Sequence, residues 1–71
     1  MRFYYVYILQ SVKCPGRFYA GFTENFRKRL AEHNDGKSVH TRDLRSWRVK
    51  TRIALTDCKA ALDFERYLKT A

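Results

Sequence analysis

The sequence predicts an α+β fold in which helices flank a small three-stranded β-sheet, antiparallel or mixed, in the order β-β-α-β-α. Two patterns predict the strands: an unbroken apolar and aromatic run near the N-terminus and an alternating run in the second half of the chain. Two other segments carry apolar residues at helical spacing next to capping residues. Because 71 residues can bury only one small core, a single domain over residues 1–71 is expected.

The first two strands are predicted to form a hairpin. Phe3–Leu9 holds aromatic and β-branched side chains at successive positions, which is typical of a strand buried on both faces. Gln10–Gly16 contains the turn residues, and Arg17–Phe22 follows as the second strand. Such a hairpin can bring Tyr7 and Tyr19 near each other, although the pattern leaves the register open.

A helix is predicted after the hairpin, with Thr23 as its N-cap and Asn34-Asp35-Gly36 at its end. Helical spacing gives this segment one shared face, made of Phe26, Leu30 and His33. Arg29 lies at the edge of that face. The other charged side chains of the helix are expected to point to solvent, namely Arg27, Lys28 and Glu32.

Cations dominate the next part of the chain. Residues 37–46 lack periodicity and are predicted to form a basic surface loop. Trp47–Leu55 alternates, which predicts a half-exposed strand. Its inner side would hold Trp47, Val49, Thr51 and Ile53, and its open side would hold a row of cations. The loop and the strand together supply the candidate nucleic-acid contacts, which are Lys37, His40, Arg42, Arg45, Arg48, Lys50 and Arg52.

The second helix is predicted from its N-cap Asp57 to about Lys69. Its apolar residues form one arc, made of Cys58, Ala61, Leu62, Phe64 and Leu68. Glu65 falls in the middle of this arc, where an ionised carboxylate needs a cation, a metal ion or hydrogen-bond donors. Three interpretations stay open: a structural salt bridge to an arginine such as Arg29, exposure to water on a short helix, and a metal-binding or catalytic role.

The charge balance narrows the class of partner. Fifteen Lys and Arg against 7 Asp and Glu give a net charge of +8, which in a small domain is typical of nucleic-acid binding. An anionic membrane surface is the alternative, but neither predicted helix has the basic face that it requires. The sequence shows neither a signal peptide nor an apolar run near ~18 residues. A cytoplasmic protein with reduced Cys14 and Cys58 is therefore expected, with a single disulfide as the alternative.

Five elements in order resemble the GIY-YIG nuclease superfamily, and most closely its small single-domain bacterial proteins. Tyr5-Val6-Tyr7 and Tyr19-Ala20-Gly21 correspond to the two signature tripeptides. Arg29 follows Gly21 by eight residues, and His33 follows Arg29 by four. The fifth element is the acidic helix segment Ala-Leu-Asp-Phe-Glu-Arg-Tyr-Leu-Lys, which contains Glu65. In addition, Arg45-Ser46-Trp47 resembles the Arg-Pro-Trp of the small single-domain members. Three positions depart from the pattern: Tyr5 replaces a glycine, Ala20 replaces an isoleucine or valine, and Ser46 replaces a proline.

The resemblance implies an endonuclease that hydrolyses phosphodiester bonds in DNA with one divalent cation, Mg²⁺ or Mn²⁺. Carried over by position, Glu65 would hold the metal and Arg29 would clamp the scissile phosphate. Tyr7 and Tyr19 would flank the attacking water, and His33 would assist proton transfer or contact the phosphate. Such a protein could serve DNA repair or processing.

The sequence leaves open two alternatives to a nuclease that acts alone. The chain could be a non-catalytic module that grips phosphates through its basic face, or a subunit that acts only with a protein partner supplying DNA affinity. Binding alone requires no carboxylate beside the phosphate, so the presence of Glu65 together with the tyrosines, Arg29 and His33 favours a nuclease.

Overall fold

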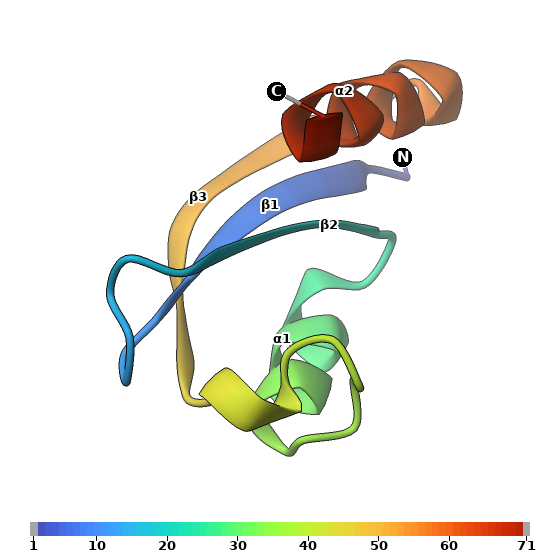
Figure 1. Ribbon diagram of the computed structural model, residues 1–71. Helices are drawn as coiled ribbons and strands as arrows, with labels where there is room; N and C mark the ends of the chain where they lie inside the picture. The colour runs from blue at the N-terminus through green and yellow to red at the C-terminus, as the bar shows by residue number, and fades with distance from the viewer. Residues whose placement is uncertain (1, 71) are drawn as a thin grey trace.

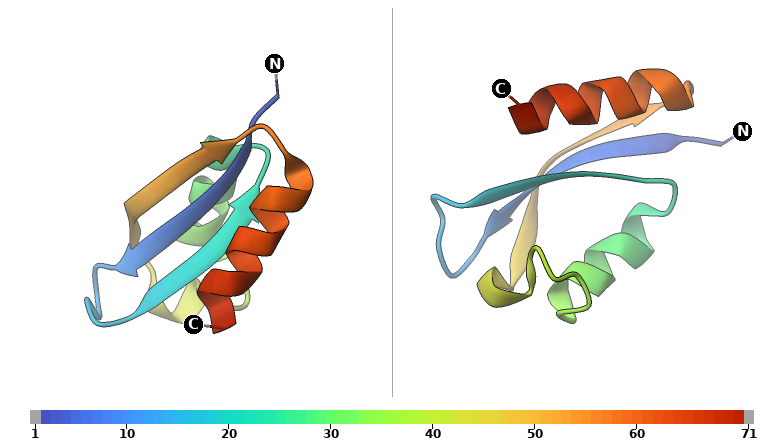
Figure 2. Two further views of the ribbon diagram at one scale, coloured as in Figure 1. Left: turned by 90° about the horizontal axis from the view of Figure 1, so that it is seen from above. Right: turned by 45° about the vertical axis from the view of Figure 1, so that its right-hand side comes forward.

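The computed structural model describes residues 2–70, and the predicted α+β class and element order are confirmed (Figure 1). The elements are β1 (Tyr4–Ser11), β2 (Phe18–Thr23), α1 (Phe26–Asn34), a 3₁₀ turn (Arg42–Leu44), β3 (Trp47–Leu55) and α2 (Cys58–Thr70). The three strands form one antiparallel sheet in the order β2-β1-β3. Helix α2 covers one face of this sheet, while α1 and the 3₁₀ turn lie on the other (Figure 2).

Strand β1 is the centre of the sheet, which explains why its sequence is apolar on both faces. It pairs with β2 through the hairpin, and this register sets Tyr7 opposite Gly21 and Leu9 opposite Tyr19. Its other edge pairs with β3, although a helix and a loop separate the two strands in sequence. The same central strand therefore supports both layers of the fold.

Strand β3 contains an irregularity that contradicts the predicted division of its two faces. Ile8 pairs with Thr51 and Leu9 pairs with Val49, so Lys50 is an extra residue opposite that step. The bulge reverses the alternation, because paired residues point to the same face of a sheet. Trp47, Val49 and Arg52 accordingly share the face of α1, while Arg48, Thr51 and Ile53 share the face of α2. The cations of β3 do not form the single row that was predicted.

The main core lies between the sheet and α1. Tyr7, Leu9, Phe26 and Trp47 form its buried cluster, and Leu30 packs against it. The predicted face of α1 is therefore confirmed. On the opposite side of the sheet, Ala61 of α2 is fully buried.

The segment between α1 and β3 is more than a surface loop. It contains the 3₁₀ turn, and it buries Ser38 and Thr41. The indole Nε1 of Trp47 donates to the carbonyl oxygen of Thr41 at 2.8 Å. Asn34 accepts from the Trp47 backbone N–H at 2.6 Å and donates to the Trp47 carbonyl oxygen at 3.2 Å. These bonds hold the loop against the end of α1 and so fix the position of Thr41.

The N-cap of α1 is Asn25, so the prediction of Thr23 is wrong by two residues. Asn25 Oδ1 accepts from the backbone N–H of Lys28 at 3.1 Å, while Thr23 Oγ1 accepts from the N–H of Asn25 and closes the turn before it. The predicted end is confirmed, since Gly36 has a φ of 79°. The Asp57 cap of α2 is also confirmed, because its carboxylate accepts from the N–H of Lys59 at 3.1 Å.

Two further expectations concern the chain as a whole. Cys14 and Cys58 are both free thiols. Within residues 2–70, no helix is long and apolar enough to cross a bilayer.

Candidate active site

Two tyrosines and a histidine meet on the α1 side of the sheet. Tyr7 and Leu9 are alternate residues of β1, and Tyr19 lies opposite Leu9 on β2, so both tyrosine rings are directed to one face. The Tyr7 hydroxyl is 3.0 Å from His33 Nε2, and the centroids of the Tyr19 and His33 rings are 5.1 Å apart. The expected approach of the two tyrosines is therefore found, with the imidazole ring of α1 as their common neighbour.

Gly21 makes room for the Tyr7 side chain. The two residues are paired across β1 and β2, and a Cβ on Gly21 would collide with the ring and hydroxyl of Tyr7. The glycine thus permits the phenol to lie across the neighbouring strand. The requirement is steric, because Gly21 does not have a positive φ.

His33 is fully buried, with both ring nitrogens hydrogen-bonded. Nε2 faces the Tyr7 hydroxyl, and Nδ1 lies 2.7 Å from Thr41 Oγ1. Burial lowers the pKa of His33 from 6.5 to about 4, with a smaller contribution from the positive charge of Arg29. The imidazole is therefore neutral near pH 7, and it joins the tyrosines to the loop.

Tyr7 is also in its neutral form. Burial raises the pKa of its phenol above 10.0, and the nearby Arg29 opposes this effect without cancelling it. Tyr7 is 2% exposed, whereas Tyr19 is only partly buried. Tyr19 is thus the phenol that a substrate meets first, with Tyr7 behind it.

Arg29 lies beside this cluster, at the predicted edge of α1. Its Nη1 donates to Glu32 Oε1 at 3.0 Å, and both side chains are about one-third exposed. Glu32 was expected to point to solvent. Its side chain is partly exposed, and its carboxylate in addition holds the guanidinium of Arg29 one helical turn away. The remaining donors of Arg29 can still form a paired contact with a phosphate.

Glu65 lies on α2, on the opposite side of the sheet from α1. Its side chain is 17% exposed, and its Oε2 accepts from Lys69 Nζ at 2.7 Å. The same ammonium group is 5.0 Å from the centroid of the Tyr19 ring, so Lys69 links the carboxylate to the tyrosines around the β2 edge. Glu65 is near enough for its charge to contribute to the raised pKa of Tyr7. Arg29 pairs with Glu32, so the predicted structural bridge from Glu65 to Arg29 is not the arrangement found, and neither is full exposure to water.

The donor set suits a cation held by few protein ligands. Among residues 2–70, no group of three or more His, Cys, Asp and Glu could enclose a metal ion. Glu65 instead offers a single shielded carboxylate that already attracts an ammonium group. Mg²⁺ accepts such a site, since it keeps several waters and takes one or two carboxylates together with substrate phosphates.

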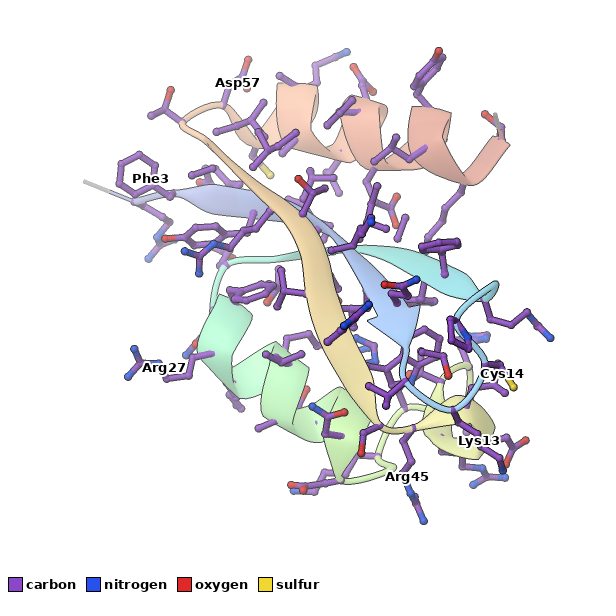
Figure 3. All side chains as sticks on the ribbon, turned by 90° about the vertical axis from the view of Figure 1, so that its left-hand side faces the viewer. Phe3, Lys13, Cys14, Arg27, Arg45 and Asp57 are labelled. Atoms are coloured by element: carbon purple, nitrogen blue, oxygen red, sulfur yellow. The ribbon has the colours of Figure 1, made fainter. Side chains whose placement is uncertain are left out.

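The candidate DNA-binding cations lie over several parts of the surface. Arg52 covers the ring of Phe26 at 4.9 Å, and Arg48 donates to Gln10 on the other face of the sheet. Arg45 is directed away from the sheet beyond the end of α1 (Figure 3). His40 instead borders an open hollow of about 580 Å³, next to Tyr19 and Lys69. The remaining three are exposed: Lys37, Arg42 and Lys50.

Three residues of the site were absent from the sequence prediction. Thr41 lies in a loop without periodicity, so no pattern pointed to its bond with His33. Glu32 and Lys69 could have been found by spacing, because Glu32 follows Arg29 by three residues and Lys69 follows Glu65 by four.

Comparison with known proteins adds evidence from beyond the chain. A family model described as the GIY-YIG catalytic domain matches residues 3–71. A "Structure-specific endonuclease subunit SLX1 homolog" of Leishmania infantum is 38% identical over 71 residues; the match covers 90% of this chain and 10% of that protein. A UPF0213 protein of Bacillus licheniformis is 35% identical over 71 residues, with 93% of this chain and 67% of the relative covered. No solved structure shows a significant match.

Proposed function

The chain belongs to the GIY-YIG family, and from that membership we propose that it is an endonuclease that hydrolyses phosphodiester bonds in DNA with one Mg²⁺ or Mn²⁺ ion. The observation that carries the proposal is the convergence of two tyrosines, a histidine, an arginine and a shielded carboxylate from both sides of one sheet edge. The relative named as a structure-specific endonuclease subunit supports the endonuclease activity. A role in DNA repair or processing is part of this proposal.

Arg29 binds the scissile phosphate. Glu32 fixes one nitrogen of its guanidinium, which restricts the side chain before the substrate arrives. The free nitrogens then contact two phosphate oxygens, and the positive charge opposes the negative charge that develops in the transition state. A lysine at this position would supply the charge without the planar, paired contact.

Tyr19 contacts the attacking water, because it is the more exposed of the two phenols. For the Tyr7–His33 pair to receive the proton, this water must also reach the Tyr7 hydroxyl behind Tyr19. Tyr7 then accepts the proton on oxygen while its own proton passes to His33 Nε2, 3.0 Å away. Tyr7 stays neutral throughout, which agrees with the raised pKa of its phenol. His33 is a weak base, with a pKa of about 4, so it holds the proton only briefly and returns it through the Tyr7 hydroxyl to the leaving oxygen.

Glu65 would be the protein ligand for the divalent cation, which would compete with Lys69 for this carboxylate. The bound ion would stabilise the leaving oxygen and neutralise developing charge. This assignment is supported by the position of Glu65 in an otherwise apolar arc and by its low exposure.

A second candidate function is a catalytic subunit that depends on a protein partner for its DNA affinity. The distribution of its cations favours this possibility, since β3 directs Arg48 and Arg52 to opposite faces and leaves no continuous basic row. The L. infantum relative is named a subunit, and this chain spans about a tenth of it. A protein of this kind would cut its substrate slowly when tested alone.

Cleavage of plasmid, single-stranded and branched DNA tests the proposal. Each substrate is incubated with Mg²⁺, with Mn²⁺ and with a chelator, and Arg29→Lys is prepared in parallel to exclude a contaminating nuclease. We expect metal-dependent cutting that falls about 100-fold in Arg29→Lys, because the paired phosphate contact is lost. Salt-sensitive binding without cutting of any substrate by the wild type would instead identify a binding module or a missing partner.

A further inference from the structure

Lys69 differs from an ordinary surface lysine in its surroundings. Its ammonium group contacts a carboxylate that is 17% exposed, while its own side chain is 44% exposed. Lys59 and Asp63 provide a comparison on the same helix, with the same four-residue spacing and an N–O distance of 2.9 Å. Their side chains are 85% and 52% exposed, so that pair belongs to the open surface.

Lys69 also borders the hollow beside Tyr19. Ile8, Ala20 and Leu68 give this hollow an apolar wall, and the exposed Phe18 lies at its rim. With a volume of about 580 Å³ and an open mouth, it can admit part of a nucleotide strand. The flexible four-carbon stem of a lysine lets an ammonium group turn from Glu65 into this space.

An ammonium group and a divalent cation bound to the same carboxylate compete with each other, since their positive charges repel at short distance. A divalent ion would carry twice the charge and take oxygen ligands directly, so its binding would favour release of the lysine. The displaced ammonium group then needs another anion. The phosphate backbone of a strand bound at Tyr19 would supply one, because the ammonium group lies 5.0 Å from the centroid of the Tyr19 ring.

We propose that Lys69 is a second phosphate-binding residue of the site, neutralised by Glu65 in the metal-free protein and released to the DNA strand when Glu65 binds the metal. The proposal rests on the proposed function and adds a regulation to it. Metal binding and DNA binding assist each other through one side chain, and thermodynamic linkage requires this coupling to be reciprocal.

DNA binding in the presence of a chelator isolates the effect of Lys69 from cleavage. The variants form a cycle of wild type, Glu65→Gln, Lys69→Gln and the double variant. Glu65→Gln should bind a labelled single strand about fivefold more tightly than wild type, because it frees the ammonium group without metal. The gain should largely disappear in the double variant. A plot of the logarithm of the DNA-binding constant against the logarithm of the salt concentration should become steeper by about 0.7 in Glu65→Gln alone. This is the change expected for one added phosphate contact to a single strand.

Asp63→Asn, Lys59→Gln and their double variant make the matched control cycle, because they change the same charges on the same helix. Their effects on DNA binding should be additive. If the Glu65 and Lys69 effects are equally additive, Lys69 is an ordinary surface ion pair and the proposal is overturned. Circular dichroism spectra of all variants verify that each compared protein is folded.

Mn²⁺ binding without DNA provides the second test. Lys69→Gln should bind Mn²⁺ about fivefold more tightly than wild type by titration calorimetry, since the competing ammonium group is gone. Lys59→Gln should match the wild type. Unchanged or weaker Mn²⁺ binding by Lys69→Gln overturns the inference. Failure of the proposed nuclease would appear separately, as the absence of metal-dependent cutting by the wild type.

Discussion

Single residues of the site make close contacts, so a change in the volume or charge of one side chain disturbs its neighbours. Tyr7 can reach His33 only because Gly21 lacks a side chain, and His33 keeps its orientation because Thr41 occupies its second nitrogen. Helical spacing placed Arg29 and His33 on one side of a helix, and the predicted hairpin allowed Tyr7 and Tyr19 to approach without fixing their register. The family resemblance combined the four residues in one site. The sequence could not identify Thr41, because a loop without periodicity does not indicate which of its side chains turn towards the core.

Gly21→Ala should destabilise the protein by about 2 kcal/mol, because the new methyl group collides with the buried phenol of Tyr7. Urea unfolding monitored by tryptophan fluorescence measures the change. Gly16→Ala is the control, since no atom lies within 4 Å of a Cβ placed there. Equal stability of the two variants would mean that Tyr7 does not lie across Gly21.

His33 should make stability depend on pH. Its folded pKa of about 4 lies below the unfolded value of 6.5, so the unfolded chain binds the extra proton between these values. The stabilising effect is complete above pH 6.5 and is lost as the pH falls toward 4, amounting to about 2 kcal/mol between pH 7 and pH 5.

Urea unfolding at pH 7 and pH 5 measures this loss. His33→Asn should abolish most of the difference, whereas His40→Gln, which changes the exposed histidine, should retain it. A pH dependence that follows His40 would contradict the buried, neutral imidazole.

Among the strands and helices, the helix ends and the β3 bulge determine where the site residues lie. The order of strands and helices followed from periodicity. The capping residues located the first and last residues of both helices to within a few positions. The bulge in β3 was missed because an alternating run reads as continuous until it is aligned with its partner strand. One extra residue at Lys50 then moved Arg52 to the α1 face and onto the ring of Phe26.

Asn25 should be the residue that starts α1. Asn25→Ala removes the side-chain acceptor for the Lys28 N–H and should cost about 1 kcal/mol of unfolding free energy. Asn25→Asp keeps an acceptor oxygen and should retain near wild-type stability. Thermal unfolding by circular dichroism compares the two variants. A loss of the same size in both would show that the cap is elsewhere.

At the scale of the whole molecule, the two faces of the sheet contribute different parts of the chemistry. Helices α1 and α2 lie on opposite sides of the sheet (Figure 2). The tyrosines, His33 and Arg29 belong to the α1 side, and Glu65 is on α2. The anomaly of a carboxylate in an apolar arc was visible in the sequence, but its partner was not, because helical spacing alone does not distinguish Lys69 from a distant arginine. Packing of α2 against β1 and β2 settles that choice.

The proposed reaction requires Glu65 to hold the metal ion. Single-turnover cleavage in Mg²⁺ by Glu65→Gln is therefore compared with cleavage by Asp63→Asn, because both variants remove one carboxylate charge from α2. We expect a loss of at least about 100-fold for Glu65→Gln and a rate within about twofold of wild type for Asp63→Asn. Cleavage by Glu65→Gln at the wild-type rate would show that Glu65 does not hold the metal ion.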